Sequence, residues 1–179
     1  MKILLFGVSQ VGKSTVAAAI SEKLKIRMID IDYYIIDKYG SVENFQMVYQ
    51  DLNERLRVKT DIIISLCRKY NNIVIPVSPI YSIVEHKRIL KELANCIKFN
   101  LVATPKAIFE RTGYYDEKGK LLPFSEEYKM LHKDSIIAEI INDNFSNFNE
   151  FRYYEAIDTT NLSVDEVASL IIKKAGKNN

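Results

Sequence analysis

Short apolar runs along this chain alternate with longer segments in which apolar residues recur every three or four positions. Apolar runs at residues 3–6, 26–29, 73–77 and 97–103 predict four strands, and residues 156–159 predict a short fifth strand. Continuous apolar runs are typical of strands buried on both faces of a parallel sheet. The pattern therefore predicts an α/β fold in three layers, with a parallel five-stranded sheet that carries helices on both faces.

Segments of helical spacing lie between these runs. They cover residues 14–24, 33–50 (a helix, a turn and a helix), 51–70, 80–93, 105–111, a helix from Ser125 through Ile140, and a closing helix from Ser163. The polar residues 142–149 predict the end of the helix that begins at Ser125, and the lysine-rich residues after Ile172 predict a frayed end. Ser163 and Glu166 stand three residues apart, which predicts a capping box.

Length and composition favour a single domain over residues 1–179, because a chain of this size with 47% hydrophobic residues can bury a core of its own. The net charge of +2 gives no broad attraction to nucleic acid or anionic lipid. No apolar run approaches the roughly 20 residues of a membrane span, and the first run is too short for a secretory signal. We therefore expect a cytoplasmic protein, with Cys67 and Cys96 as buried thiols outside any disulfide or zinc site.

A phosphate-binding motif follows the first predicted strand directly. Residues 7–14 read Gly-Val-Ser-Gln-Val-Gly-Lys-Ser and fit the pattern Gly-x-x-x-x-Gly-Lys-Ser, with an amphipathic helix next. The glycines let backbone N–H groups turn around a phosphate, at which the helix also aims its positive end. The motif predicts a P-loop fold that binds ATP, with Lys13 on the β- and γ-phosphates and Ser14 on Mg²⁺. The expected nucleotide-binding residues are Gly7, Gln10, Val11, Gly12, Lys13, Ser14 and Thr15.

Asp30 and Asp32 stand two residues apart at the end of the second predicted strand. Ligands of open α/β sheets bind beside the carboxyl ends of the strands, so both carboxylates are expected near the γ-phosphate. One of them can order Mg²⁺, and the other can accept a proton from an attacking hydroxyl. Either residue can also cap the helix that begins near Tyr33, and both roles are compatible in one residue.

With these motifs the chain resembles the small-molecule kinases of the P-loop class, above all shikimate kinase, with gluconate kinase and adenylylsulfate kinase as relatives. The resemblance implies that Asp30 serves the metal and that Asp32 binds the acceptor and acts as the base. It also implies an arginine that grips the acceptor's carboxylate, for which Arg57 is the best match. The other residues that it implies are the nucleotide-binding Arg111, the catalytic lid cation Lys120 and a second acceptor arginine, Arg152.

The chain departs from the shikimate kinase pattern on the acceptor side. A glycine triplet after the third strand is absent, and Pro76-Val77-Ser78-Pro79 stands there instead, with similarity to adenylylsulfate kinase. Ser78 is therefore an expected acceptor residue, and Pro76 is unusual within a strand because proline cannot donate a ladder hydrogen bond. The charged, glycine-containing residues 113–124 predict a lid loop. Its Lys120 stands where the family has an arginine, which is not an equivalent cation.

The expected function is an ATP- and Mg²⁺-dependent phosphotransferase that moves the γ-phosphate to a hydroxyl of a small anionic metabolite. An adenylylsulfate or nucleotide kinase is an alternative, as are a nucleotide-binding regulatory ATPase and an inactive kinase-like protein. Arg57 and Lys120 can equally be ordinary surface residues, and His86 and His132 stand without ligand partners, which argues against metal or catalytic roles. The sequence predicts no nucleic-acid or membrane partner and leaves the acceptor and the oligomeric state open.

Overall fold

The fold was analysed in a computed structural model, which describes residues 1–77, 79–80, 82–114, 121–151 and 154–177, and the side chains of these apart from residues 148–151. Its sheet has five parallel strands in the order β2-β3-β1-β4-β5. The strands are β1 (Lys2–Phe6), β2 (Arg27–Met28), β3 (Ile73–Pro76), β4 (Ile97–Val102) and β5 (Glu155–Asp158). The predicted parallel five-stranded sheet is confirmed.

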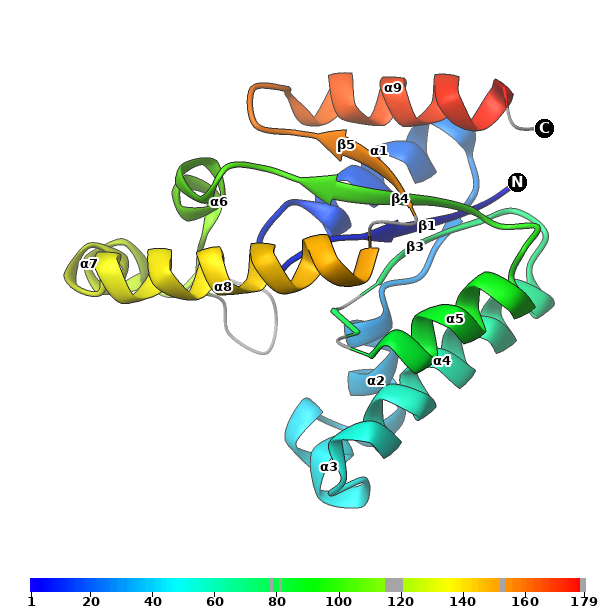
Figure 1. Cartoon of the computed structure of the whole chain (residues 1–179), viewed down its shortest axis with the longest axis horizontal. Coiled ribbons are helices and arrows are strands. Elements are labelled where there is room, and N and C mark those ends of the chain that lie inside the picture. The colour runs from blue at the N-terminus through cyan, green and yellow to red at the C-terminus, as the bar shows by residue number, and fades with distance from the viewer. Residues whose placement is uncertain (78, 81, 115–120, 152–153, 178–179) are drawn as a thin grey trace.

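Helices cover both faces of this sheet (Figure 1). They are α1 (Lys13–Leu24), α2 (Ile31–Tyr39), α3 (Val42–Val48), α4 (Leu52–Lys69), α5 (Ile83–Glu92), α6 (Pro105–Arg111), α7 (Ser125–Leu131), α8 (Lys133–Phe151) and α9 (Val164–Lys177). One face packs on α1 and α9, and the other packs on α4 and α5 (Figure 1). Within the described part of the chain, no helix is long and apolar enough to cross a membrane.

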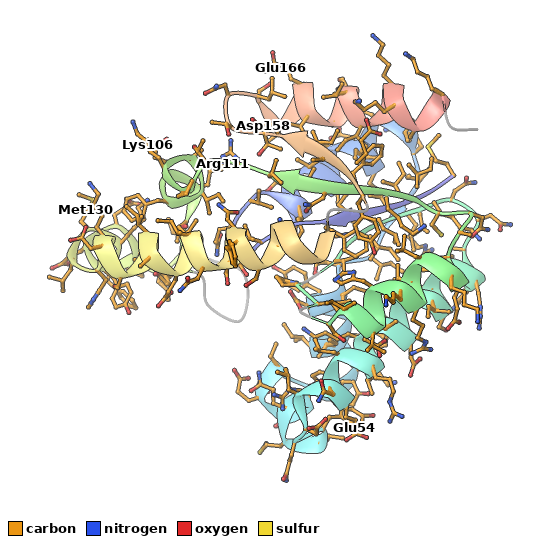
Figure 2. All side chains as sticks on the ribbon, viewed as in Figure 1. Glu54, Lys106, Arg111, Met130, Asp158 and Glu166 are labelled. Atoms are coloured by element: carbon orange, nitrogen blue, oxygen red, sulfur yellow. The ribbon has the colours of Figure 1, made fainter. Side chains whose placement is uncertain are left out.

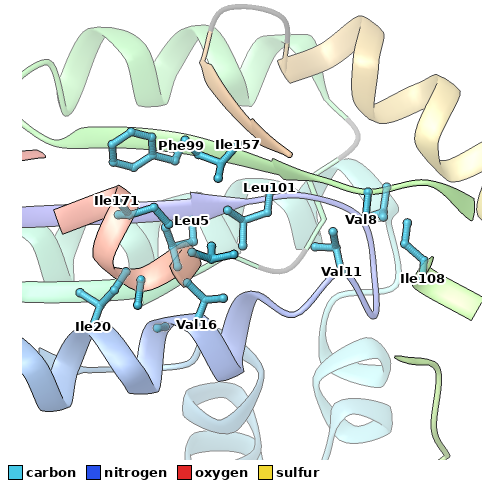
Figure 3. Packing of buried hydrophobic residues seen from close by; sticks show 14 of the residues in the cluster. Leu5, Val8, Val11, Val16, Ile20, Phe99, Leu101, Ile108, Ile157 and Ile171 are labelled. Atoms are coloured by element: carbon cyan, nitrogen blue, oxygen red, sulfur yellow. The ribbon is translucent and has the colours of Figure 1, made fainter. Parts of the chain in front are cut away.

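The core has two layers because successive side chains of a strand point to opposite faces of the sheet. In β1, Ile3 and Leu5 pack with α1 and α9, whereas Leu4 and Phe6 pack toward α4 and α5. Figure 3 shows the first layer, where Leu5 lies among Val16, Ile171 and Leu101. Cys67 and Cys96 are buried in the second layer and are not disulfide-bonded, as expected.

Pro76 occupies a central strand without breaking a ladder. Val77 N–H donates to Leu5 O of β1, while Val74 O accepts from Ile29 on the β2 side, so alternate residues of β3 face opposite neighbours. Pro76 therefore faces the β2 side, beyond the point where β2 ends at Met28. Since there is no β2 strand at that level to accept a hydrogen bond, proline loses nothing there.

Four helix boundaries differ from the sequence-based expectation, two of them in the segment after residue 125. The helix predicted from Ser125 through Ile140 is two helices that break at His132, and the polar residues 142–149 continue α8 instead of ending it. These residues stay helical because some of them find partners inside the protein: Asn144 donates to Ala103 O at 3.4 Å, and Asn147 is buried. Tertiary contacts of this kind override weak helix propensity.

The other two differences are the end of α9, which burial explains, and the start of α5, which capping explains. The last helix does not fray after Ile172 but continues to Lys177, because Ala175 is fully buried against the first core layer. The helix expected from residue 80 begins at Ile83, since Ser82 caps it by accepting from Glu85 N–H. The capping box at the start of α9 is confirmed by hydrogen bonds in both directions between Ser163 and Glu166.

Candidate active site

The loop between β1 and α1 has a backbone that only a few residue types can adopt. Gly7 has φ +140° and Gly12 has φ +103°, and Gln10 also lies in the left-handed region with φ +62°. A Cβ atom at Gly7 would lie 2.6 Å from Leu101 O of β4, so a side chain there would push the loop away from the sheet. The motif glycine therefore keeps the loop seated on the carboxyl end of β4.

The first turn of α1 is suited to an anion. Gly12 caps the helix without a side chain, and the first turn contains no acidic residue. The N–H groups of the turn and the positive end of the helix dipole consequently point toward whatever occupies the loop. Ser14 and Thr15 are exposed at the same place. This geometry is that of a phosphate site, as the motif predicts.

Lys13 turns its ammonium into the loop, where it donates to Gly7 O at 3.0 Å and Val8 O at 2.7 Å. Burial of the ammonium lowers the pKa of Lys13 to about 8, although the negative charges of Asp32, Asp30 and Asp143 oppose this shift. The ammonium is thus poorly hydrated where it lies in the loop. Phosphate oxygens would supply the missing negative charge.

Ser14 and Asp30 form the second part of the site. Ser14 Oγ donates to Asp30 Oδ2 at 2.6 Å, which joins the start of α1 to the end of β2. The other carboxylate oxygen of Asp30 accepts from Asp32 N–H at 3.0 Å and caps α2. Asp30 thus caps α2, and its metal role stays a prediction. Its Oδ2 and the Ser14 hydroxyl are hard oxygen donors beside the phosphate loop, the donor type that Mg²⁺ prefers.

Asp32 faces a lysine of α4 and not the arginine expected from the sequence. Lys59 Nζ lies 3.7 Å from Asp32 Oδ1, and the exposed fractions of the two side chains are 20% and 54%. Arg57, which was expected to grip the acceptor, is 61% exposed and lies 3.5 Å from Glu54. No described contact places Arg57 beside Asp32. The acceptor role expected for Arg57 stays a prediction.

Arg111 lies at the end of α6 and holds the turn after β5. Its guanidinium donates to Thr159 Oγ1 at 2.9 Å, Thr159 O at 2.6 Å and Thr160 O at 3.2 Å. Figure 2 shows Arg111 and Asp158 at the same edge of the sheet. Asp158 shapes that turn by accepting from Thr160 N–H, and this hydrogen bonding lowers the pKa of Asp158. Several hydrogen bonds thus fix the plane of the guanidinium.

A pocket of about 240 Å³ lies beside this arginine and opens next to the phosphate loop. Its walls come from the loop, α1, α6, the turn after β5 and the start of α9. The lining residues are Gln10, Val11, Gly12, Thr15, Val16, Arg111, Thr159, Leu162, Val164 and Val167. A flat, partly apolar ligand group attached to a phosphate chain in the loop would fit here.

Three expected site residues, Ser78, Lys120 and Arg152, lie outside the described residues. The base of the predicted lid is described. Tyr114 N–H donates to Ser125 Oγ at 2.9 Å, and Leu122 N–H donates to Tyr114 O at 2.8 Å, so the two ends of the predicted lid meet. Gln10 Nε2 donates to Gly113 O at 3.4 Å and links the phosphate loop to that base.

Several residues of the site were missed by sequence reasoning. Lys59 lies about 60° from the centre of the buried stripe of α4 that contains Leu56 and Ile63, whereas Arg57 lies about 100° to the other side, so a helical wheel would have favoured Lys59. Thr159 follows the last strand, and strand ends are where ligand sites gather. Asp143 of α8 had no such signal, because only the folded chain brings its charge close to Lys13.

A parallel sheet in this order, with a phosphate loop after β1 and carboxylates after β2, defines a P-loop kinase of small molecules. The profile of the family described as shikimate kinase matches residues 9–175, which is most of the chain. The chain therefore belongs to the shikimate kinase family, and the protein is a kinase. Comparison with curated proteins finds no significant sequence match.

Solved structures of the same fold agree with this family. Shikimate kinase from Bacteroides thetaiotaomicron has a TM-score of 0.74 at 14% identity, over 98% of each chain. Shikimate kinase from Acinetobacter baumannii in complex with shikimate has a TM-score of 0.67 at 18% identity, over 99% of this chain and 94% of its own. A gluconokinase from Sinorhizobium meliloti 1021 has a TM-score of 0.58 at 15% identity, over 99% of this chain and 94% of its own. At these identities the likeness shows the fold alone.

Proposed function

We propose that this protein transfers the γ-phosphate of ATP, with Mg²⁺, to a hydroxyl group of a small anionic metabolite of the hydroxy-acid type, as a shikimate kinase does. The observation that carries this proposal is the placement of two polar pairs around one lysine. Ser14–Asp30 joins the start of α1 to the end of β2, Asp32–Lys59 joins α2 to α4, and the charges of Asp30 and Asp32 act on Lys13.

ATP binding is supported by the loop and by the pocket beside Arg111. The phosphates would replace Gly7 O and Val8 O as partners of the Lys13 ammonium. The adenine base would lie in the 240 Å³ pocket, against the guanidinium plane that Thr159 and Thr160 hold. A guanidinium fixed in this way can stack on a flat aromatic ring.

Ser14 and Asp30 would hold Mg²⁺. Among the described residues, no group of three or more His, Cys, Asp or Glu side chains forms a metal site. This fits a magnesium ion that keeps several waters and takes its other ligands from phosphate oxygens. When bound, the ion neutralises charge on the transferred phosphoryl group.

Asp32 and Lys59 would form the acceptor side. Asp32 Oδ1 can accept the proton of the attacking hydroxyl, while Lys59 attracts the anionic group of the acceptor. Lys13 stabilises negative charge on the phosphoryl group as the bond to the leaving phosphate breaks. We also propose, from the family resemblance, that Ser78 and Arg152 contact the acceptor and that Lys120 is the lid cation.

The test is a transfer assay with purified protein, ATP·Mg²⁺ and a panel of acceptors that includes shikimate, gluconate, other hydroxy acids and neutral sugars. We expect a phosphate monoester from an anionic member of the panel, and we expect Asp32→Asn to form it about 10²-fold more slowly while nucleotide binding persists. Transfer to neutral sugars alone would refute the anionic acceptor. Nucleotide binding without transfer to any acceptor would refute the phosphotransferase.

A further inference from the structure

A buried histidine joins two connections that are distant in the sequence. His86 is 2% exposed, and its Nε2 lies 2.7 Å from Ile80 O while its Nδ1 lies 3.1 Å from Tyr154 Oη. A carbonyl oxygen can only accept, so Nε2 carries the proton. Nδ1 is then the acceptor, and the Tyr154 hydroxyl donates to it. His86 is thus a neutral bridge with one donor and one acceptor in use.

The surroundings of the bridge keep both of its side chains neutral. Burial lowers the pKa of His86 and raises the pKa of Tyr154. Phe6 stacks on the Tyr154 ring at a centroid distance of 4.5 Å and meets the His86 ring edge-on at 5.9 Å. Since Phe6 is the last residue of β1 and directly precedes Gly7, the bridge is anchored against the strand that carries the phosphate loop.

The two ends of the bridge belong to the connections that flank the proposed acceptor side. Ile80 is fully buried in the connection after β3, two residues beyond Ser78. Tyr154 stands at the start of β5, two residues beyond Arg152. His86 itself comes from the first turns of α5, which begins where the first connection ends. One imidazole therefore sets the distance between both connections and the end of β1.

We propose that His86 is a positioning residue for the acceptor half of the site: through Ile80 O and Tyr154 Oη it holds the described end of the connection after β3 and the residue directly before β5. His86 touches neither substrate, and its effect reaches the acceptor only through these connections. The nucleotide half has supports of its own, since Lys13 donates to Gly7 O and Val8 O in the loop and Arg111 holds the turn after β5, so we expect it to change less when the bridge is removed. This inference rests on the proposed function.

The chain allows each half of the bridge to be removed separately. Tyr154→Phe removes the hydroxyl that donates to Nδ1 and keeps the ring on Phe6. In His86→Gln the amide N–H can still donate to Ile80 O in place of Nε2, but the acceptor for the Tyr154 hydroxyl is lost. This variant should therefore behave like Tyr154→Phe. His86→Phe removes both hydrogen bonds and should have the larger effect. His132→Gln is the matched control, since His132 is exposed and packs only its ring face on Tyr128 among the described contacts.

The first readout is hydrogen–deuterium exchange of the full chain without ligand. We expect exchange of the backbone amides of residues 154–157 to rise about 10-fold in Tyr154→Phe and His86→Gln. In His86→Phe the amides of residues 77–80 should follow, while residues 3–15 stay within about 2-fold of wild type in all variants. Unchanged exchange in both connections, or a uniform rise across the sheet, would overturn the positioning role. If His86→Phe does not fold, the other two variants decide.

The second readout is steady-state kinetics with shikimate as the probe acceptor. We expect the KM for shikimate to rise about 10-fold in Tyr154→Phe and His86→Gln, with the KM for ATP within about 2-fold of wild type and His132→Gln unchanged. Equal changes in both KM values would mean a general structural role and would overturn the inference. If wild-type protein does not phosphorylate shikimate, that result counts against a shikimate-like acceptor, and hydrogen exchange alone decides the role of His86.

Discussion

The nucleotide half of the site is made largely of backbone, whereas the acceptor half is made of side chains from separate helices. Gly7, Gly12 and the first turn of α1 are consecutive in sequence, and their conformation follows from local rules. Asp32 and Lys59 meet only because α2 and α4 pack beside each other. Under the proposed function, a local motif therefore specifies where ATP binds, and long-range packing specifies where the acceptor binds.

This difference explains how a chain with only 14–18% identity to solved shikimate kinases can share their fold and family. The phosphate loop tolerates few changes, because a Cβ at Gly7 would collide with Leu101 O. The acceptor side has no such backbone constraint. There a lysine on one turn of α4 can take the place of an arginine on another, with a point charge in place of a planar fork.

The largest effect is expected from Lys13, because the phosphoryl group that it would stabilise passes from the nucleotide half to the acceptor half. Lys13→Met removes the cation that stabilises the transferred phosphoryl group, and kcat should fall about 10³-fold. Initial rates of ADP formation with the acceptor identified by the panel will measure it. Lys106→Met, which changes an exposed lysine of α6, is the control and should leave kcat unchanged. A loss below about 10-fold in Lys13→Met would contradict the role assigned to Lys13.

Neutralising Asp30 and Asp32 one at a time distinguishes the metal role from the acceptor role. Asp32→Asn should lower kcat about 10²-fold, because the attacking hydroxyl loses its base, while the affinity for ATP stays within about 2-fold. Asp30→Asn should instead raise the Mg²⁺ concentration needed for half-maximal rate, since Asp30 shares the Ser14 hydroxyl. Magnesium titrations at saturating ATP distinguish the two variants. The same magnesium response in both would argue that the carboxylates have one common role.

The pair Lys59→Met and Arg57→Met tests the acceptor side directly. Removing the lysine beside Asp32 should raise the KM for an anionic acceptor roughly 20-fold, as expected for a lost charge-assisted hydrogen bond. Removing the exposed arginine two residues earlier should change it by less than about 2-fold. Steady-state kinetics at saturating ATP measure both. If Arg57→Met had the larger effect, the acceptor would lie on the other side of α4.

The lowered pKa of Lys13 predicts a pH effect confined to the nucleotide half. Phosphates raise this pKa in the complex, so above pH about 8 the free protein must take up a proton to bind ATP. Affinity should fall about 10-fold between pH 7 and pH 9, with proton uptake near one at pH 9. Calorimetric titration with an ATP analogue in two buffers of different ionisation enthalpy measures the uptake. Lys13→Arg keeps its charge and should abolish the uptake.

The same pKa acts on stability with the opposite sign. In the unfolded chain Lys13 keeps its proton up to about pH 10.5, whereas in the folded chain it loses the proton near pH 8. The unfolded state then binds more protons between these values, so the contribution of Lys13 to the free energy of unfolding rises with pH in this window. Denaturant titrations of wild type and Lys13→Met at pH 7.5 and pH 10 isolate it. A wild-type advantage that shrinks with rising pH would contradict the assignment.

The smallest effect is expected at the base pocket. Arg111→Lys loses the planar fork that Thr159 and Thr160 hold, and the KM for ATP should rise about 5-fold with the acceptor KM unchanged. Competition with a triphosphate that lacks a nucleobase tests whether Arg111 acts on the base. Arg111→Lys should bind this ligand as well as wild type does. Equal weakening for both ligands would show that Arg111 acts on the phosphates and not on the base.

The fold was predictable because its signals are local. Apolar runs gave all five strands, and the motif at residues 7–14 located the loop with its direction relative to the sheet. The errors arose where burial decides. Asn147 and Ala175 are buried, so the helices that contain them run on past polar or lysine-rich sequence that would otherwise end a helix.

The acceptor side was less predictable for the same reason. The family resemblance named Arg57, but the rotation of α4 about its own axis, set by the packing of Leu56 and Ile63, turns Lys59 toward Asp32. The bridge from His86 to Tyr154 spans 68 positions, and no local pattern announces it. Residues that bind by backbone can be found in a motif, whereas residues that bind by side chain need the packed structure.

Phosphorus NMR of the purified protein with ATP·Mg²⁺ and an anionic hydroxy-acid acceptor tests the central claim most directly. The account predicts a phosphate monoester signal that grows in step with ADP and forms about 10²-fold more slowly in Asp32→Asn, although that variant still binds the ATP analogue. ADP together with inorganic phosphate alone, unaffected by Asp32→Asn across the whole acceptor panel, would contradict it.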